Sequence, residues 1–232
     1  MTIELLGVGA RRGRTPVLRD ITVSLTHPVT TIMGPNGAGK TTLLHVLAGL
    51  VGHTGSISMD GRPLRFPEAL PLIGYAPQSI EWPGRLSVRE VCELAAHLRE
   101  VPRDECSRRV GAALHAGGLS DLADRRVSTL SGGQRRRLSL AQALVHSPRV
   151  LLLDEPTSEL DPLFCESFAD TLGDLATRHQ VVVTTHSIED VARWSGDVLL
   201  ISRGALTRVA DADSMSPEQR SGAVRSAFHA VA

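Results

Sequence analysis

A glycine-rich segment between a short apolar run and a helical pattern most constrains this chain. Residues 34–41 read Gly-Pro-Asn-Gly-Ala-Gly-Lys-Thr and fit the pattern G-x-x-x-x-G-K-[ST]. Residues 30–33 before it are typical of a buried strand, and residues 40–50 after it follow a helical pattern. A glycine loop in this position presents main-chain N–H groups to an anion, and the dipole of the following helix favours negative charge there. The segment therefore predicts a phosphate-binding loop.

The residues of this loop have separate expected tasks. Lys40 is expected to reach the β- and γ-phosphates of a nucleotide, the Thr41 hydroxyl to hold Mg²⁺, and Thr42 to reach the α-phosphate. The alternative is a glycine-rich turn with a chance lysine, which the strand and helix on either side disfavour. The predicted nucleotide-binding set of this loop is Gly34, Pro35, Asn36, Gly37, Ala38, Gly39, Lys40, Thr41 and Thr42.

Two carboxylates follow a second apolar run. Residues 150–153 have the length and composition of a buried strand, and Asp154 and Glu155 come directly after it. In open α/β sheets, ligands bind at the carboxyl ends of the strands. We therefore expect Asp154 to hold Mg²⁺ through water and Glu155 to polarise an attacking water. An acidic pair that only caps a loop is the alternative.

A third segment, Leu-Ser-Gly-Gly-Gln at residues 130–134, lies between the other two. Ser131 and Gln134 have the spacing of a capping box, which predicts that a helix begins here. Taken alone, the segment favours a simple cap. A glycine-rich helix start is also an anion site, because its N–H groups are exposed, and the two functions are compatible.

Together, the order and spacing of the three segments resemble the ATP-binding cassette (ABC) family, the nucleotide-binding subunits of ABC transporters. The resemblance extends from Leu18 to about Val209. It implies an ATPase that uses ATP and Mg²⁺ and closes head-to-tail with a second ATP-binding subunit, as a homodimer or a heterodimer. It also implies that Ser131, Gly133 and Gln134 touch the γ-phosphate bound by the other subunit.

Three further positions match the family's motifs. Gln78, at the end of Gly-Tyr-Ala-Pro-Gln, resembles the glutamine that contacts Mg²⁺ and the attacking water. His186 resembles the switch histidine at the γ-phosphate; a lone histidine is more often structural, but this one follows a strand pattern. Asp161 ends a segment that resembles the loop crossing between subunits. The resemblance thus implies the catalytic residues Lys40, Gln78, Glu155 and His186 and the metal ligands Thr41, Gln78 and Asp154.

One position departs from the family. Members usually place an aromatic residue ahead of the second strand, where it stacks on adenine. Residues 6–13 of this chain contain no aromatic side chain, and counting back from Asp20 puts Arg12 at that place. A guanidinium stacks on a base with less specificity than an aromatic ring, so we expect weak selectivity for the base.

The alternation of strand and helix patterns predicts an α/β fold with a P-loop NTPase core, a mostly parallel central sheet, an N-terminal antiparallel β subdomain and an inserted α-helical subdomain. Residues 1–232 are expected to form a single ABC ATPase domain. Residues 1–77 and 148–210 would be the core with its β subdomain, about 79–147 the helical signature subdomain, and 211–232 a tail with few anchors and a short helix.

The charge balance limits the class of partner. The chain has 25 Lys and Arg and 25 Asp and Glu, whereas nucleic-acid-binding proteins usually have a basic surplus. The run Arg135 to Arg137 is interpreted as the solvent-exposed side of a helix, because adjacent residues on a helix do not share a face. No nucleic-acid partner is expected.

The expected location is the cytoplasmic face of a membrane. The three cysteines are scattered, as in reduced cytosolic proteins, and no secretory signal is expected at the start. No apolar stretch approaches the roughly 18 residues that span a bilayer. We therefore expect a separate integral membrane permease, with this chain peripheral on the inner face of the cell membrane. The Leu-Ser-Val-Arg-Glu segment at 86–90 and the arginine-rich helix look more like exporter-type than importer-type cassettes.

Three other ATPase classes are alternatives. DNA-maintenance ATPases of the same superfamily interrupt the cassette with coiled coils or zinc modules, and the stretch from Lys40 to Ser131 has no sustained heptads or Cys pairs. Translation-type ATPases usually carry two cassettes, whereas this chain has one. A small-molecule P-loop kinase would not need residues 130–134, and ATP hydrolysis without an added acceptor would argue against it.

Overall fold

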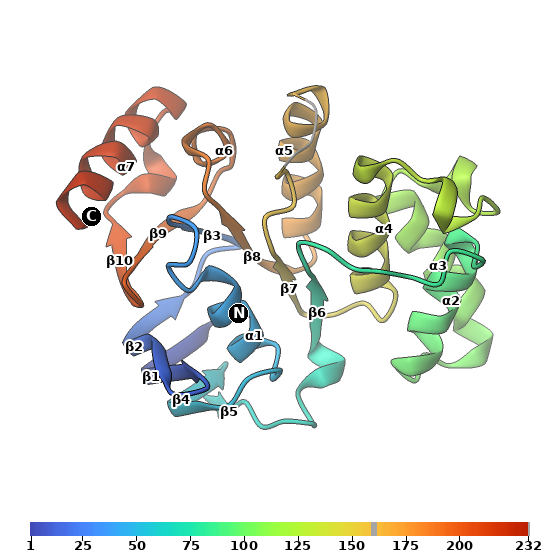
Figure 1. The fold of residues 1–232 in the computed structure, drawn as a ribbon, viewed down its shortest axis with the longest axis horizontal. Helices are drawn as coiled ribbons and strands as arrows, with labels where there is room; N and C mark the ends of the chain where they lie inside the picture. Colours follow the sequence, from blue (N-terminus) through green and yellow to red (C-terminus); the bar gives the residue numbers. More distant parts are fainter. Residues whose placement is uncertain (159–161, 232) are drawn as a thin grey trace.

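The larger of two β-sheets forms the centre of this computed structural model, which describes residues 1–158 and 162–231 (Figure 1). Its strand order is β10-β9-β3-β8-β7-β6, with every pair parallel except the edge pair β9 and β10. The strands are β3 (Val29–Met33), β6 (Ile73–Ala76), β7 (Val150–Leu153), β8 (Gln180–Thr185), β9 (Asp197–Ser202) and β10 (Ala205–Val209).

The central strands β3, β7 and β8 are buried along their whole length, which explains their unbroken apolar sequences. Alternate residues enter different cores: Val182 packs with helix α1 (Lys40–Leu47), whereas Val181 and Val183 pack with helix α5 (Pro162–Ala176). The sheet is therefore covered on both faces, and its strand ends are the places where polar side chains reach solvent.

The second sheet is antiparallel, with the order β2-β1-β4-β5. It lies beside α1 in Figure 1, and its inward side chains share one apolar core with α1 and the central sheet. Its strands are β1 (Ile3–Arg12), β2 (Thr15–Leu25), β4 (His53–Met59) and β5 (Arg62–Pro63). The β1–β2 pair ends next to the phosphate loop and carries Arg12 there.

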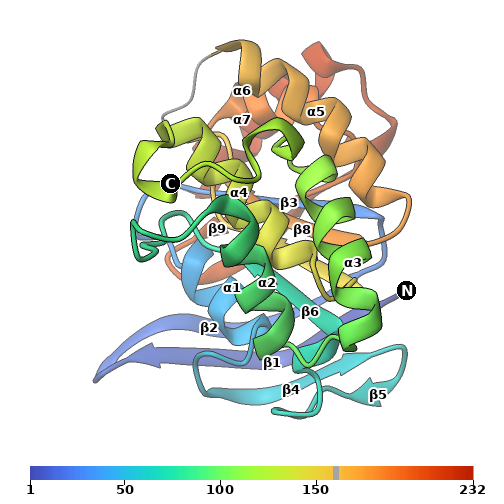
Figure 2. The same ribbon diagram turned by 90° about the vertical axis from the view of Figure 1, so that its right-hand side faces the viewer.

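Three helices form a block at the β6 edge of the central sheet (Figure 2). Helices α2 (Val88–Leu98) and α3 (Arg103–Ala116) pack against α4 (Gly132–Leu144), and α4 in turn packs on β6 and β7. Helix α4 is thus the element that connects the block to the sheet. Together with the antiparallel sheet, this arrangement confirms the predicted fold class.

The C-terminal segment differs from the expectation of a weakly anchored tail. Helix α7 (Pro217–Val231) has 15 residues and packs on helix α6 (Ile188–Arg193) and on β9. Arg220 is only 4% exposed and donates to the carbonyl oxygens of Ala212, at 2.8 Å, and of Trp194. The Trp194 carbonyl lies at the end of α6 and the Ala212 carbonyl lies between β10 and α7, so the tail is part of the fold. Among the described helices, none is long and apolar enough to cross a membrane.

Candidate active site

A cavity of about 660 Å³ brings together residues that follow strands β3, β6, β7 and β8. The phosphate loop and Glu155, far apart in sequence, meet here because the carboxyl ends of parallel strands lie at one edge of the sheet, whereas Asp154 is buried behind the wall. Two groups of predicted residues contribute to the wall: the phosphate loop, and single residues after the other strands. The lining residues are Arg12, Val17, Asn36, Gly37, Gly39, Lys40, Thr41, Thr42, Gln78, Glu155, Ser158 and His186.

The phosphate loop needs its glycines for two separate reasons. A Cβ atom on Gly34 would lie 2.3 Å from the carbonyl oxygen of Ile201, so no side chain fits between the loop and β9. Gly37 and Gly39 have φ angles of 80° and 112°, which other L-residues rarely adopt. The loop then enters α1 directly, so the N–H groups of the first helical turn face the cavity, as an anion site requires.

Lys40 lies in this cavity, and its ammonium group contacts three oxygen atoms. Its Nζ donates to the carbonyl oxygens of Gly34, at 2.7 Å, and Pro35, at 3.2 Å, and lies 3.0 Å from Oε1 of Glu155. The side chain is almost completely buried, so the ammonium group is held at the mouth of the loop. A phosphate in the loop would lie beside this fixed cation.

Glu155 is held on three sides. Its Oε1 pairs with Lys40, its Oε2 lies 3.0 Å from Nδ1 of His186, and its main-chain N–H donates to Oγ1 of Thr184 at 2.9 Å. Its φ angle of 45° is in the left-handed region, which is uncommon for a residue other than glycine. In this conformation the carboxylate faces the phosphate loop, where its Oε1 contacts Lys40.

Asp154 has a different environment from its neighbour. It is 2% exposed, its Oδ1 accepts a 2.8 Å hydrogen bond from Oγ1 of Thr184, and its Oδ2 accepts a longer one, at 3.5 Å, from the hydroxyl of Tyr75. Burial, followed by the Asp154 charge, raises the pKa of Tyr75, so this phenol stays a hydrogen-bond donor. The hydroxyl of Tyr75 also lies 3.0 Å from Nε2 of His45 on α1. These partners fix the rotamer of Asp154 at the strand end.

The donor set fits Mg²⁺. Thr41, Gln78 and Asp154 offer a hydroxyl, an amide oxygen and a carboxylate, the oxygen ligands that a hard cation prefers. Mg²⁺ is usually held by one or two carboxylates together with substrate phosphates rather than by an all-protein cage. In the described part of the chain no cluster of three or more His, Cys, Asp or Glu side chains has the geometry of a metal cage. Bound Mg²⁺ would supply charge neutralisation at the phosphates.

Asp190 is a buried carboxylate that the sequence analysis did not identify, and its hydrogen bonds connect the loop after β7 to the end of β8. Oδ2 of Asp190 accepts 2.7 Å hydrogen bonds from the hydroxyls of Thr157, in the loop after β7, and Thr185, at the end of β8. Asp190 lies on α6, whose N-cap is Ser187, directly after His186. No local sequence signal identifies it, because its partners are brought together only by the pairing of β7 with β8.

The interpretation of the arginine run as a solvent-exposed side holds for Arg135 alone, because Arg136 and Arg137 are half-buried. Arg135 is exposed, but Arg136 donates from Nη1 to the carbonyl oxygen of Glu155, at 3.0 Å, and from Nη2 to that of Ser158, at 3.2 Å. Helix α4 packs on the edge of the sheet, so its 136 position faces the loop after β7 rather than solvent. A nucleic-acid contact gains no support from this arginine.

The residues of the third segment lie outside the cavity. Ser131 and Gln134 form the predicted capping box, with Ser131 N donating to Oε1 of Gln134 at 3.0 Å and Gln134 N donating to Oγ of Ser131 at 3.3 Å. Ser131 and Gly133 do not line the wall formed by Lys40 and Glu155. The predicted contact of Ser131, Gly133 and Gln134 with a nucleotide therefore requires another subunit. Asp161 lies outside the described residues.

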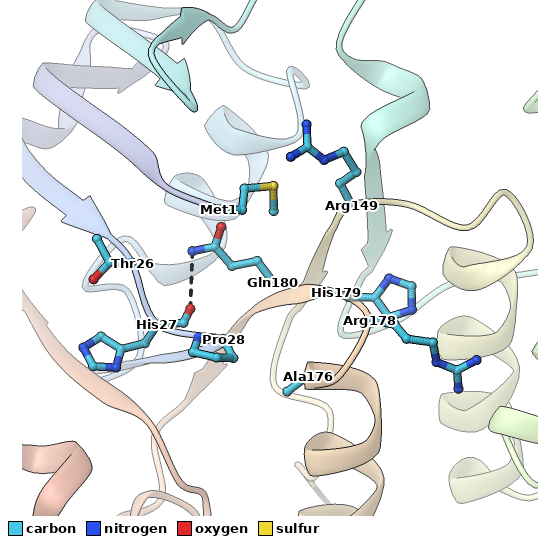
Figure 3. A pocket seen from close by; sticks show the side chains of 9 residues that line it. All are labelled: Met1, Thr26, His27, Pro28, Arg149, Ala176, Arg178, His179 and Gln180. Carbon is cyan, nitrogen blue, oxygen red and sulfur yellow. Dashed lines mark hydrogen bonds between the residues drawn. The ribbon is translucent and has the colours of Figure 1, made fainter.

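A second hollow, of about 310 Å³, lies at the opposite ends of β3, β7 and β8 (Figure 3). Arg149, Arg178, His27 and His179 line it, but Figure 3 shows Arg178 and His179 pointing to one side and His27 to the other. Gln180 uses its amide nitrogen to hold the carbonyl oxygens of Leu25 and His27. The basic groups do not converge on one point, in contrast to the groups around Lys40.

Comparison with known proteins decides the family. The family model described as ABC transporter matches residues 18–158, which include the phosphate loop, the third segment and both carboxylates. The chain belongs to the ABC transporter ATP-binding family. The resemblance inferred from the motifs is thereby confirmed.

The names of curated relatives of this ABC protein include both import and export proteins. It is 34% identical over 82% of its length to the uncharacterized ABC transporter ATP-binding protein YxlF of Bacillus subtilis, and 35% identical over 84% to the zinc import ATP-binding protein ZnuC of Cereibacter sphaeroides. It is 34% identical over 87% of its length to the Nod factor export ATP-binding protein I of Cupriavidus pinatubonensis. The aligned regions span 63%, 77% and 64% of these three relatives.

Solved structures agree with the fold of this ABC protein. CbiO1 from Clostridium perfringens, described as part of the ABC transporter complex CbiONQ, superimposes with a TM-score of 0.76 at 27% identity, covering 88% of this chain and 86% of that one. An ATP-binding subunit of an ABC transporter gives a TM-score of 0.78 at 20% identity, covering 95% and 98%, and supports the fold alone. The roles assigned to single residues stay predictions, because these similarities do not test them.

Proposed function

We propose that this chain is the ATP-hydrolysing subunit of an ABC transporter and works with a separate integral membrane permease. The observation that carries the proposal is the joint placement of Lys40, Glu155 and His186 around one cavity that also contains the phosphate loop. A phosphate loop alone would serve a kinase as well. A carboxylate fixed beside the lysine and next to a histidine is suited to activating water as the acceptor.

The proposed roles follow from the contacts. Main-chain N–H groups of residues 36–42 and the Lys40 ammonium hold the phosphates, and Thr41, Gln78 and Asp154 hold Mg²⁺. Glu155 polarises the water, and His186 orients the carboxylate of Glu155 and contacts the γ-phosphate. Arg12 lies against the base. Positioning and electrostatic stabilisation supply most of the catalysis in such phosphoryl transfers.

The proposal includes a second ATP-binding subunit, identical or related. Two subunits close head-to-tail over two Mg-ATP, and each completes the other's site with Ser131, Gly133 and Gln134, while Asp161 belongs to the crossing loop. Support comes from the exposed glycine-rich start of α4, whose cap leaves further N–H groups for an anion. CbiO1, which has a similar fold, is described as part of a transporter complex, CbiONQ.

We further propose that the protein is peripheral on the inner, cytoplasmic face of the cell membrane, bound through the permease, and that the transporter is an exporter. The sequence of residues 86–90 and the arginine-rich α4 favour export, and the relatives include a Nod factor export protein as well as importers. Transport assays with the co-expressed permease in vesicles of either orientation test the direction, since uptake into inside-out vesicles on adding ATP is the expected result.

One biochemical experiment tests the ATPase function. The purified chain should release phosphate from ATP in Mg²⁺ without any added acceptor, and removing Mg²⁺ with a chelator should stop the release. Lys40→Ala should lose nucleotide binding, because Lys40 lines the cavity beside the phosphate loop. If residues 34–41 formed only a structural turn, the substitution would leave nucleotide binding unchanged. Phosphate release that appears only after adding a small-molecule acceptor would identify a kinase instead.

A further inference from the structure

Arg136 connects helix α4 to the segment that carries Glu155. The guanidinium donates from Nη1 to the carbonyl oxygen of Glu155, at 3.0 Å, and from Nη2 to that of Ser158, at 3.2 Å. These two bonds come from one rigid planar fork, so they fix the distance between two carbonyl groups three residues apart. Arg136 lies in the second turn of a helix whose N-cap is Ser131. A single side chain therefore joins the start of α4 to the loop after β7.

The main chain at Glu155 needs such support. Its φ angle of 45° is a strained conformation for a residue other than glycine and persists only where neighbouring groups hold it. Thr184 accepts the N–H of Glu155, and Arg136 donates to its carbonyl oxygen, so both flanking peptide groups are fixed. Because the peptide planes set the direction of Cα–Cβ, these bonds also set where the carboxylate points.

Helix α4 has a second polar link to the nucleotide side. Nε1 of Trp82 donates to Oε1 of Gln142 at 2.8 Å, and Trp82 belongs to the segment that follows Gln78. The same helix thus contacts the segment after Gln78 near its end and the segment with Glu155 near its start. A displacement of α4 would reach both segments through hydrogen bonds.

We infer that Arg136 is a positioning residue for hydrolysis: it holds the main chain of Glu155 so that the carboxylate faces the phosphates, and it makes that carboxylate follow movements of the Ser131 end of α4. The inference rests on the proposed role of Glu155. Where Ser131 meets the nucleotide of a second subunit, that contact is transmitted to the carboxylate of its own subunit through one side chain.

The first test compares two adjacent arginines of α4. Arg136→Ala should lower the turnover number for ATP by roughly 10- to 100-fold, as removal of outer-shell partners typically does, while the dissociation constant of ATP changes less than about twofold. Arg135→Ala is the matched control, because Arg135 is exposed on the same helix and should keep normal turnover. Thermal unfolding of both variants shows whether the fold is retained. Arg136→Lys, which donates to one carbonyl at a time, should restore part of the loss.

A double-mutant cycle shows whether Arg136 acts through Glu155. In single-turnover assays, Arg136→Ala should cause less than a twofold further loss in the Glu155→Gln background, because the carboxylate that it positions is already gone. Equal losses in both backgrounds, or normal turnover of Arg136→Ala beside an inactive Glu155→Gln, would overturn the inference and leave the proposed function intact. Near-normal turnover of Glu155→Gln itself would overturn the inference and also the role that the proposed function gives to Glu155.

Discussion

Nζ of Lys40 and Oε1 of Glu155 lie 3.0 Å apart, so the lysine of the phosphate loop and the carboxylate after β7 form a buried ion pair. The remaining donors of Lys40 are directed at the carbonyl oxygens of Gly34 and Pro35. Phosphate oxygens in the loop and the Glu155 carboxylate would therefore share one ammonium group. Removing the charge of Glu155 has consequences for binding as well as for hydrolysis, because it removes an anion that repels the phosphates.

The first prediction concerns Glu155→Gln. The amide keeps the shape of the side chain but cannot act as a base, so turnover should fall by roughly 10²- to 10⁴-fold. The affinity for ATP should be equal or higher, because the repelling charge is gone. Size-exclusion chromatography with ATP and Mg²⁺ should show a dimer of the variant, since the nucleotide is not consumed.

Glu218→Gln provides the control for this substitution, because Glu218 is an exposed carboxylate on α7 and its variant should hydrolyse ATP at the normal rate. A Glu155→Gln protein that hydrolyses ATP at a near-normal rate would exclude Glu155 as the base. A variant that fails to bind ATP would show that the carboxylate serves the structure of the loop.

The residues that local sequence signals could identify are those at strand and helix ends. Two strands and the cavity at their ends were predictable from the apolar runs before Gly34 and Asp154. The helix cap was predictable from the spacing of Ser131 and Gln134. Each of these features depends on a few adjacent residues and on the rule that parallel strands expose their carboxyl ends together.

The residues that the sequence could not identify make contacts between distant segments. Thr184, Asp190 and Arg136 are ordinary residues in their own segments, and each acquires its role from a partner about 20 to 35 positions away. Arg220 is a similar case, because one of its acceptors is the carbonyl oxygen of Trp194, at the end of another helix. Such contacts depend on which elements are neighbours in space, and local patterns do not determine that.

The second prediction compares two buried threonines of neighbouring strands. Oγ1 of Thr184 donates to Asp154 and accepts the N–H of Glu155, so Thr184→Val should leave that buried N–H unpaired and lower the free energy of unfolding by about 1–3 kcal/mol. The Mg²⁺ concentration for half-maximal turnover should rise, because Asp154 loses a partner that fixes its rotamer. Oγ1 of Thr30 is buried without a hydrogen-bond partner among the described residues, so Thr30→Val should be neutral or stabilising. Urea unfolding measures both effects, and equal losses in the two variants would contradict the assigned role of Thr184.

The third prediction concerns pH and His146. Burial, followed by the positive charge of Arg99, lowers the pKa of His146 to about 4, and its Nε2 lies 3.1 Å from the carbonyl oxygen of Ile73. The unfolded chain, with a histidine pKa near 6.5, binds a proton that the folded protein does not bind between these two values. The free energy of unfolding should therefore fall as the pH drops from about 6.5 toward 4, by up to about 3 kcal/mol.

The measurement for His146 is urea unfolding at several pH values. His146→Gln keeps a donor for Ile73 but does not titrate, so its stability should vary less between pH 6.5 and 5, where few carboxylates change their charge. His115→Gln, on the exposed side of α3, should keep the pH dependence of the unsubstituted protein. Identical pH profiles for all three proteins would show that His146 does not contribute.

The last prediction concerns the base of the nucleotide. Arg12 and Val17 line the cavity beside the phosphate loop, and no Phe, Tyr or Trp is among the described residues of its wall. Phosphate contacts should therefore supply most of the affinity, and the dissociation constants of ATP and GTP should differ by less than tenfold, about 1.4 kcal/mol. Arg12→Ala should weaken both nucleotides by a similar factor, whereas Arg12→Tyr should strengthen binding by stacking. Competition binding with a fluorescent nucleotide measures all of these constants. A larger preference of the unsubstituted protein for ATP would mean that a residue other than Arg12 recognises adenine, because a guanidinium stacked on a purine ring does not distinguish the two bases by their edges.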